Sequence, residues 1–302
     1  MSILTFRLGA LRLHLLTDGV FWLDGGAAFG LVPRVLWEKV AQPDASHRIP
    51  NQLRCLLIES DDGLILVDTG YGDKLSAKQR EQVGLVGEKR LLGALAKAGY
   101  STGDIRTVIN THLHGDHCGG NTSLDATGAV EPTYPNARYL IQRLELADAT
   151  YPNERTRNAY FGENFLPLLK LRPHDGTDRV RVLSGDSQIT PEVRTWVTPG
   201  HTRAHQCVVV ESRGETAIFL ADAVAWAVSL ERLAWVPAFD VEPLVSMETK
   251  RSLRDWAWRR DALLLFQHDP VVAAGRLGRN GEEWRVEPVL LGSHVRQETE
   301  AW

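Results

Sequence analysis

Four residues that could bind a metal lie within six positions of one another in the segment Thr-His-Leu-His-Gly-Asp-His-Cys-Gly-Gly, residues 111–120. They are His112, His114, Asp116 and His117. Because alternate residues of an extended chain project to the same side, the spacing of His112 and His114 places their imidazoles together. Crowded histidines repel one another when protonated, and a bound metal removes this cost. The segment therefore predicts a metal site at the point where the apolar strand before it ends.

Three more candidate ligands follow apolar stretches later in the chain. His201 stands in Pro-Gly-His-Thr after a strand expected at Val193–Val197, and Asp222 follows the apolar run Phe-Leu-Ala. His268 stands in Phe-Gln-His-Asp-Pro. A carboxylate such as Asp222 is costly to bury unless a cation neutralises it. Each signal is weak alone, but their order after the first segment predicts that they complete the same metal site.

The complete pattern, His-x-His-x-Asp-His followed by His201, Asp222 and His268, resembles the signature of the metallo-β-lactamase superfamily. Leu66-Val67-Asp68-Thr69-Gly70 resembles the upstream aspartate motif of that family, and the resemblance covers most of the chain. It implies an α/β fold in the form of a four-layer αββα sandwich with the metal site at one edge. We expect a single domain that spans residues 1–302.

The resemblance also implies a ligand set for two divalent ions. It assigns one ion to His112, His114 and His201, the other to Asp116, His117 and His268, and a bridging role to Asp222. Asp116 and Asp222 are then the carboxylates of the catalytic centre. Asp68 is implied to orient the ligand loop, and a simple turn at the strand end is the alternative for this residue. Nitrogen and oxygen donors without thiolate suit zinc, which we expect, and they also accept manganese, iron or cobalt.

Two divalent ions about 3.5–4 Å apart can share a hydroxide and clamp the group that it attacks. The resulting net positive charge favours the oxyanion that develops at a carbonyl or phosphoryl centre. We therefore expect a binuclear metal-dependent hydrolase in which a metal-bound hydroxide attacks a lactone or ester, with a phosphotriester as a further option. Two alternatives remain open. One is a sulfur dioxygenase with a single iron, and the other is a catalytically idle metal-binding protein.

Within the superfamily, the chain most resembles quorum-quenching lactonases of the YtnP type and methyl-parathion-hydrolase-like enzymes, on segments such as Asn51–Glu59 and Phe266–Pro270. One position departs from part of this group. Some acyl-homoserine-lactone lactonases carry a tyrosine three residues after the bridging aspartate, and this chain has Ala225 there. A phenol that assists the leaving group is therefore absent at that place.

Aromatic residues near the expected metal edge are candidates for an apolar substrate pocket. We expect Trp226, Phe21, Trp22 and Phe161 to contribute to it; Phe29, Tyr160 and Trp235 are further candidates of the same kind. Packing in the hydrophobic core is the alternative for each of them.

Short apolar runs predict the strands that must position these residues. They are Cys55–Glu59, Leu64–Val67, Thr107–Asn110, Tyr139–Gln142, Val180–Leu183, Val193–Val197, Cys207–Glu211, Ala217–Leu220 and Leu263–Phe266, after a strand-turn-strand start. Helices are expected at Glu88–Ala98 and Thr249–Arg260. The segment 148–170 is rich in Tyr, Asn, Phe and Arg, so it is either a lid or substrate-facing insertion, or an ordinary surface helix and loop.

Composition limits the remaining function classes. The chain has 302 residues, of which 43% are hydrophobic and 24% charged, with a net charge of −4. These values argue against disorder, and the lack of a basic run gives no reason to expect a nucleic-acid partner.

No stretch approaches the roughly 20 apolar residues of a membrane helix, so no membrane partner is expected. The three cysteines contain no CxxC pair, and the first residues lack a signal-peptide core. These features predict a cytoplasmic protein and leave a homodimer open. The family resemblance and the lack of a basic run imply a small ester or lactone as the substrate.

Overall fold

Burial on both faces of the strands determines how the layers stack. The computed structural model describes residues 3–85, 90–171 and 178–292. In β3 (Arg48–Ser60), Leu56 and Ile58 belong to one apolar cluster, while Cys55 and Leu57 belong to another. Because successive side chains point to opposite faces, a strand that is apolar at consecutive positions must be covered on both sides.

The first sheet has seven strands in the order β1-β2-β3-β4-β5-β8-β9. Its first strands pair antiparallel, and the β4–β5, β5–β8 and β8–β9 pairs are parallel. Their bounds are β1 (Leu4–Leu8), β2 (Leu11–Asp24), β3 (Arg48–Ser60), β4 (Gly63–Val67), β5 (Ile105–Ile109), β8 (Arg138–Gln142) and β9 (Val180–Leu183). A separate two-stranded sheet joins β6 (Thr122–Leu124) and β7 (Val130–Pro132).

The second sheet has seven strands in sequence order, from β10 to β16. Only the β13–β14 pair is parallel among the described strands of this sheet. Their bounds are β10 (Ser187–Gln188), β11 (Val193–Val197), β12 (Gln206–Ser212), β13 (Glu215–Phe219), β14 (Leu263–Leu265), β15 (Val272–Asn280) and β16 (Glu283–Leu291).

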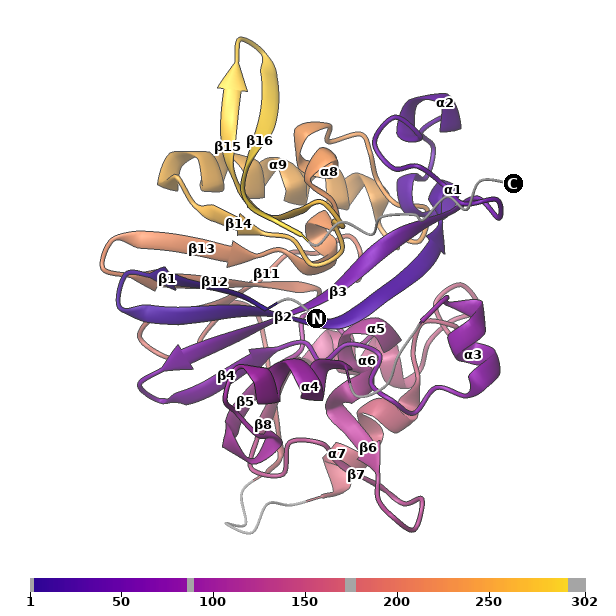
Figure 1. Ribbon diagram of the computed structural model, residues 1–302, viewed down its shortest axis with the longest axis vertical. Coiled ribbons are helices and arrows are strands. Elements are labelled where there is room, and N and C mark those ends of the chain that lie inside the picture. Colours follow the sequence, from indigo (N-terminus) through magenta and orange to yellow (C-terminus); the bar gives the residue numbers. More distant parts are fainter. Residues whose placement is uncertain (1–2, 86–89, 172–177, 293–302) are drawn as a thin grey trace.

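The two sheets face each other and helices cover their outer faces (Figure 1). The core between the sheets combines residues such as Leu56 and Val67 of the first sheet with Val208 and Phe219 of the second. The first sheet is covered by α4 (Arg90–Lys97), α6 (Arg143–Thr150) and α7 (Leu166–Lys170), and the second by α8 (Ala227–Glu231) and α9 (Pro243–Arg260). This arrangement is the predicted four-layer αββα sandwich.

The remaining helices are short and lie between strands. They are α1 (Gly25–Phe29), α2 (Arg34–Trp37), α3 (Ala77–Gln82) and α5 (Gly115–Cys118), with the 3-10 turns η1 (Thr102–Asp104), η2 (Gly119–Asn121), η3 (Gly162–Asn164) and η4 (Ala221–Val224). None of the helices in the described ranges is both long and apolar enough to cross a membrane. The candidate ligands lie just beyond the carboxyl ends of β5, β11, β13 and β14, so the fold delivers them from both sheets.

The predicted elements correspond to observed ones, with differences at their ends. The expected helix 88–98 contains α4, and its residues 88 and 89 lie outside the described residues. The helix expected from Thr249 begins earlier, at Pro243, because proline is well tolerated in a first helical turn. The hairpin of β15 and β16 was not among the expected strands.

The core between the sheets generates a stability prediction. Phe219 is fully buried there, so replacing it with alanine removes packing from both sheets. We expect Phe219→Ala to lower the free energy of unfolding by about 3–5 kcal/mol, measured by denaturant titration. Leu31→Ala is the control, because Leu31 is fully exposed. Equal stability of the two variants would contradict this description of the core.

Candidate metal centre

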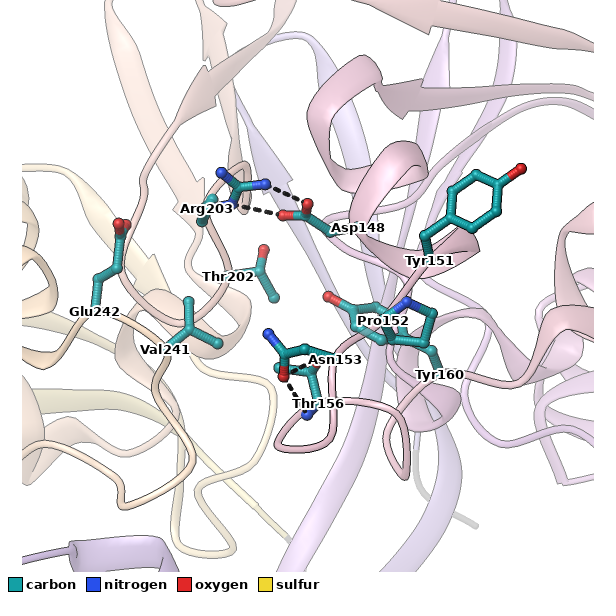
Figure 2. A pocket seen from close by; sticks show the side chains of 10 residues that line it. All are labelled: Asp148, Tyr151, Pro152, Asn153, Thr156, Tyr160, Thr202, Arg203, Val241 and Glu242. Carbon is teal, nitrogen blue, oxygen red and sulfur yellow. Dashed lines mark hydrogen bonds and ion pairs between the residues drawn. The ribbon is translucent and has the colours of Figure 1, made fainter.

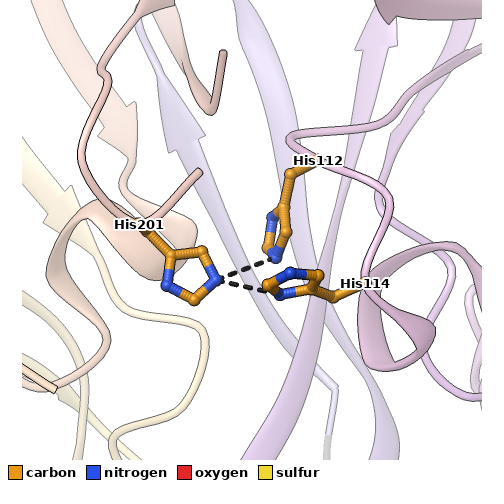
Figure 3. A group of neighbouring side chains, drawn as sticks. All are labelled: His112, His114 and His201. Atoms are coloured by element: carbon orange, nitrogen blue, oxygen red, sulfur yellow. Dashed lines mark hydrogen bonds between the residues drawn. The ribbon is translucent and has the colours of Figure 1, made fainter. Parts of the chain in front are cut away.

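The first group of candidate ligands consists of three histidines from two loops. His112 and His114 follow β5, and His201 follows β11. Nε2 of His201 lies 3.2 Å from Nε2 of His112 and 3.0 Å from Nδ1 of His114 (Figure 3). Each of the three therefore directs one ring nitrogen to a common point, which is the arrangement of a three-histidine cation site.

A second group lies beside the first. Nε2 of His117 is 3.4 Å from Oδ2 of Asp116 and 3.3 Å from Nε2 of His268. Asp222 lies between the groups, with Oδ1 2.8 Å from Nε2 of His268 and Oδ2 3.2 Å from Nε2 of His201. One carboxylate thus faces both groups, so all seven residues expected to bind metal are brought together in the structure.

The outward ring nitrogens have hydrogen-bond partners. Nδ1 of His201 is 2.9 Å from Oδ1 of Asp240, and Nδ1 of His268 is 2.7 Å from the carbonyl oxygen of Gln52. Nδ1 of His117 is 2.9 Å from Oδ2 of Asp68. Each acceptor fixes the proton on Nδ1 and leaves the inward Nε2 with a lone pair that can bind a cation.

The buried carboxylate of Asp222 tests whether a metal fits this site. Its Oδ1 atom is buried and accepts no hydrogen bond, although it lies close to His268. An ionised oxygen in that position needs a cationic partner to offset its desolvation. The donors are nitrogen and oxygen atoms in two adjoining groups, and this set fits a pair of divalent ions such as zinc.

Electrostatics place several of these residues in the protonation states that metal ligands need. Burial, reinforced by neighbouring histidines, lowers the pKa of His114 to about 3 and moves that of His112 well below its ordinary value. Burial alone would raise the pKa of Asp116, but His117 and His268 lower it to about 2. At neutral pH these imidazoles are neutral and this carboxylate is ionised.

Asp68 connects the end of β4 to the ligand loop. Its carboxylate accepts hydrogen bonds from the backbone N–H of Thr111 at 2.8 Å and from the Thr111 hydroxyl at 2.7 Å, in addition to its contact with His117. Its backbone φ is 58°, a left-handed conformation that costs free energy for a residue with a side chain. These contacts are those expected of a residue that orients the ligand loop.

Three buried residues of the site were not anticipated from the sequence. Asp240 contacts His201, and the carboxylate of Glu145 accepts hydrogen bonds from the N–H of Leu113 and the hydroxyl of Thr202. Nε2 of His205 accepts a hydrogen bond from the N–H of Asp222.

No motif marks Glu145 or Asp240. Within α6, the Arg-Leu-Glu-Leu stretch that contains Glu145 has the sequence of an ordinary surface helix, and only tertiary packing buries it.

A cavity of about 520 Å³ opens onto the candidate ligands. Phe21, Phe161 and Trp226 line it, as expected. Trp22 is not among the lining residues: it follows Phe21 in β2, so its side chain projects to the opposite face, where it packs beside Gly84. The lining also includes His114, Asp116, His201, Asp222 and His268.

The other aromatic candidates do not line this cavity. Tyr160 packs beside His114 with ring centroids 4.8 Å apart and borders a second cavity. Phe29 and Trp235 are buried in a core cluster around Trp37 and do not line the cavity. Trp226 belongs to both environments, because it packs edge-on against Phe29 and donates a hydrogen bond from Nε1 to Oδ1 of Asn51 at 2.9 Å. Its indole is therefore held rigidly at the cavity wall.

The segment 148–170 forms part of the wall of this cavity. Arg155, Asn158 and Phe161 line it, and Arg155 donates a hydrogen bond to the carbonyl oxygen of Ala238. On its other side the segment borders a second cavity, where Nε of Arg203 donates to Asp148 at 2.8 Å (Figure 2). The segment is thus tied to the loop that carries His201 and faces the candidate site.

Comparison with known proteins agrees with this geometry. The family model described as the metallo-beta-lactamase superfamily matches residues 48–301. The chain belongs to the metallo-β-lactamase superfamily. Membership confirms the resemblance found in the sequence, and it confirms the expected class of metal-dependent hydrolase.

Several members of the superfamily resemble this chain over most of its length. An N-acyl homoserine lactonase of Bacillus cereus is 28% identical over 226 residues, which cover 71% of this chain and 80% of that protein. A probable metal-dependent hydrolase from Staphylococcus aureus has a TM-score of 0.85 at 25% identity, covering 96% of this chain and 100% of its own.

A third similar protein is AidC, a dizinc quorum-quenching lactonase solved in complex with a product. It has a TM-score of 0.74 at 20% identity, and the match covers 95% of this chain and 97% of AidC. At this identity the comparison shows a shared fold.

The contact between Asp240 and His201 generates a prediction. Replacing Asp240 with alanine removes the acceptor that fixes the His201 ring, so we expect Asp240→Ala to weaken zinc binding about 10- to 100-fold. The measurement is competitive titration with a chromophoric chelator. Asp255→Ala is the matched control, because Asp255 is exposed on α9. An unchanged zinc affinity in Asp240→Ala would contradict this role.

Proposed function

We propose that this member of the superfamily is a binuclear hydrolase of lactones or esters that carry an apolar portion. The observation that carries the proposal is the position of Asp222, which faces two groups of nitrogen and oxygen donors at the floor of the apolar cavity. A single ion would leave one of these groups without a cation.

In this proposal His112, His114 and His201 would hold one ion, Asp116, His117 and His268 would hold the other, and Asp222 would contribute to both. When bound, a pair of divalent ions supplies Lewis acidity and makes a water molecule acidic enough to attack at neutral pH. Asp116 and Asp222 partly neutralise the ions and leave the site positively charged, which favours the negative charge that develops on a carbonyl oxygen. Zinc is the proposed metal.

The substrate class is inferred from the cavity and from the relatives. Aromatic and aliphatic side chains such as Phe21, Leu75, Phe161 and Trp226 line the cavity, so an apolar acyl or alkyl chain is bound without burying unpaired charge. The relatives that match this chain include N-acyl homoserine lactonases. A lactone with an apolar side chain meets both observations.

The structure bears on the two alternatives. A mononuclear iron dioxygenase needs one metal group, whereas Asp116, His117 and His268 form a further group whose donor atoms lie within 4.8 Å of one another. An idle metal-binding protein needs no substrate cavity beside its ligands. We further propose that residues 1–302 form one domain, because a single apolar core joins both sheets.

The position of Asp222 generates a prediction about metal content. Protein purified without chelator is expected to contain about two ions per chain by elemental analysis. Asp222→Ala removes the anion shared by both groups, so its metal content should fall to about one ion or fewer. The control Asp255→Ala, loaded with zinc, should keep the melting temperature of the wild type. A wild-type value of one, unchanged by added zinc or manganese, would rule out the binuclear proposal.

The cavity generates a prediction about substrates. The enzyme is expected to open medium-chain lactones or to cleave aryl esters, and chelation with dipicolinate should abolish this activity until zinc is restored. The screen includes phosphotriesters and persulfides. Failure on all esters and lactones, together with oxygen consumption on a persulfide, would assign the chain to the dioxygenase class instead.

A further inference from the structure

A tyrosine that plays no part in the metal groups lines the substrate cavity. Tyr71 follows the Asp68 motif and lies in the loop between β4 and α3. Its ring packs edge-on against Phe21 with centroids 5.6 Å apart, and Phe21 packs in the same way against His268 at 5.6 Å. A Cβ built on Gly115 would lie 3.7 Å from Cε1 of Tyr71, so the ring passes beside the metal-ligand loop.

The backbone around Tyr71 is held against that same loop. Gly70 and Gly72 on either side have φ values of 68° and 63°, which place both in the left-handed region. The carbonyl oxygen of Gly70 accepts a hydrogen bond from Gly120, and a Cβ on Gly119 would lie 2.2 Å from the carbonyl oxygen of Tyr71. This close approach fixes where the side chain of Tyr71 begins relative to the candidate metal site.

The hydroxyl of Tyr71 is available to a ligand. Among the described residues, no hydrogen-bond partner of this hydroxyl is present. Two other donors at the cavity are engaged: Asn51 donates to the carbonyl of Ile49, and Arg155 donates to the carbonyl of Ala238. A phenol has an ordinary pKa of about 10 and is protonated at neutral pH. Burial raises the pKa of Tyr71 further.

We propose that Tyr71 is a further catalytic residue of the reaction proposed above, in which its hydroxyl donates a hydrogen bond to the leaving oxygen of the lactone or ester. This inference rests on the proposed hydrolase function. The role of Tyr71 requires that the leaving oxygen of the substrate lie beside the two groups of candidate ligands. The cavity bordered by Tyr71, Asp116 and Asp222 is where such an oxygen would lie.

Position 225 bears on this assignment, because Ala225 also lines the cavity and presents only a methyl group. No phenol can act from there. Tyr71 reaches the same cavity from the first sheet, whereas Ala225 follows η4 on the second. The hydroxyl of Tyr71 can therefore donate to the substrate from the side of the first sheet, while the candidate metal ligands that face the substrate come from both sheets.

The reaction balances without an additional reagent. The oxygen of a water molecule bonds to the acyl carbon, the bond between that carbon and the leaving oxygen breaks, and the leaving oxygen takes up a proton that the water releases. Tyr71 donates its hydrogen bond while negative charge develops on the leaving oxygen, and it keeps its own proton at the end. The effect of Tyr71 is therefore largest for a leaving group that is strongly basic.

The test compares wild-type enzyme with Tyr71→Phe, both loaded with zinc. For a lactone or alkyl ester, whose leaving oxygen is basic, we expect kcat to fall about 10- to 100-fold. For a 4-nitrophenyl ester, whose leaving group needs little help, the fall should stay below about threefold. Tyr151→Phe is the matched control, since Tyr151 is exposed outside this cavity, and it should leave both rates unchanged.

A binding measurement supplies a readout that does not depend on turnover. Calorimetry with a ring-opened hydroxy acid, the product of lactone hydrolysis, should show about three- to tenfold weaker binding to Tyr71→Phe than to wild type. Metal content and melting temperature of the variant should match wild type. Equal losses of rate on both substrate types, or equal affinity for the hydroxy acid, would overturn the role of Tyr71. An inactive wild-type enzyme would instead contradict the proposed function and, with it, the catalytic role of Tyr71, whereas equal losses in an active enzyme would overturn the role of Tyr71 alone.

Discussion

The carboxylate of Asp222 is buried among the nitrogens of His117, His201 and His268, and one of its oxygens accepts no hydrogen bond. A charge in such a place is tolerated only where cations offset the loss of hydration. Asp116 and Asp222 raise the pKa of His117 well above its ordinary value in spite of its burial, so protons take the place of a cation when none is bound. Metal binding must displace these protons, and its affinity therefore rises with pH.

Holding these groups together requires an unusual backbone. Asp68, whose side chain contacts the ligand loop, has a φ of 58°. Ala221, which directly precedes Asp222, has a φ of 44°. Left-handed residues with side chains cost free energy and persist only where surrounding contacts determine them. For Asp68 the compensation is visible in its hydrogen bonds to Thr111 and His117. For Ala221 it is the burial of η4 against α9 and the second sheet.

Much of this arrangement could be predicted from local sequence. The spacing of His112, His114 and His117 indicates which side chains share a strand end, and apolar residues at consecutive positions identify the strands that are covered on both faces. The β15–β16 hairpin also has a local signal, because Gly281 begins its two-residue turn with a φ of 60°, a conformation that favours glycine.

Other residues could not be found in this way because tertiary packing decides their roles. Glu145 lies in a helix with little apolar periodicity, and it becomes part of the site only where α6 meets the loops of Leu113 and Thr202. The pocket prediction failed for Trp22 for a related reason. Adjacent residues of β2 face opposite sides, and the sequence does not say whether Phe21 or Trp22 faces the ligands.

The division of the ligands between the sheets has a consequence for how the chain reaches its native state. The loop after β5 supplies His112 to His117 from the first sheet, while His201, Asp222 and His268 all come from the second. Neither half of the sandwich can assemble a complete set of donors by itself. High-affinity capture of the ions is therefore a late event, which follows docking of the two halves and the closure of long loops. Once captured, the ions cross-link segments far apart in the chain, so their dissociation must precede or accompany separation of the sheets.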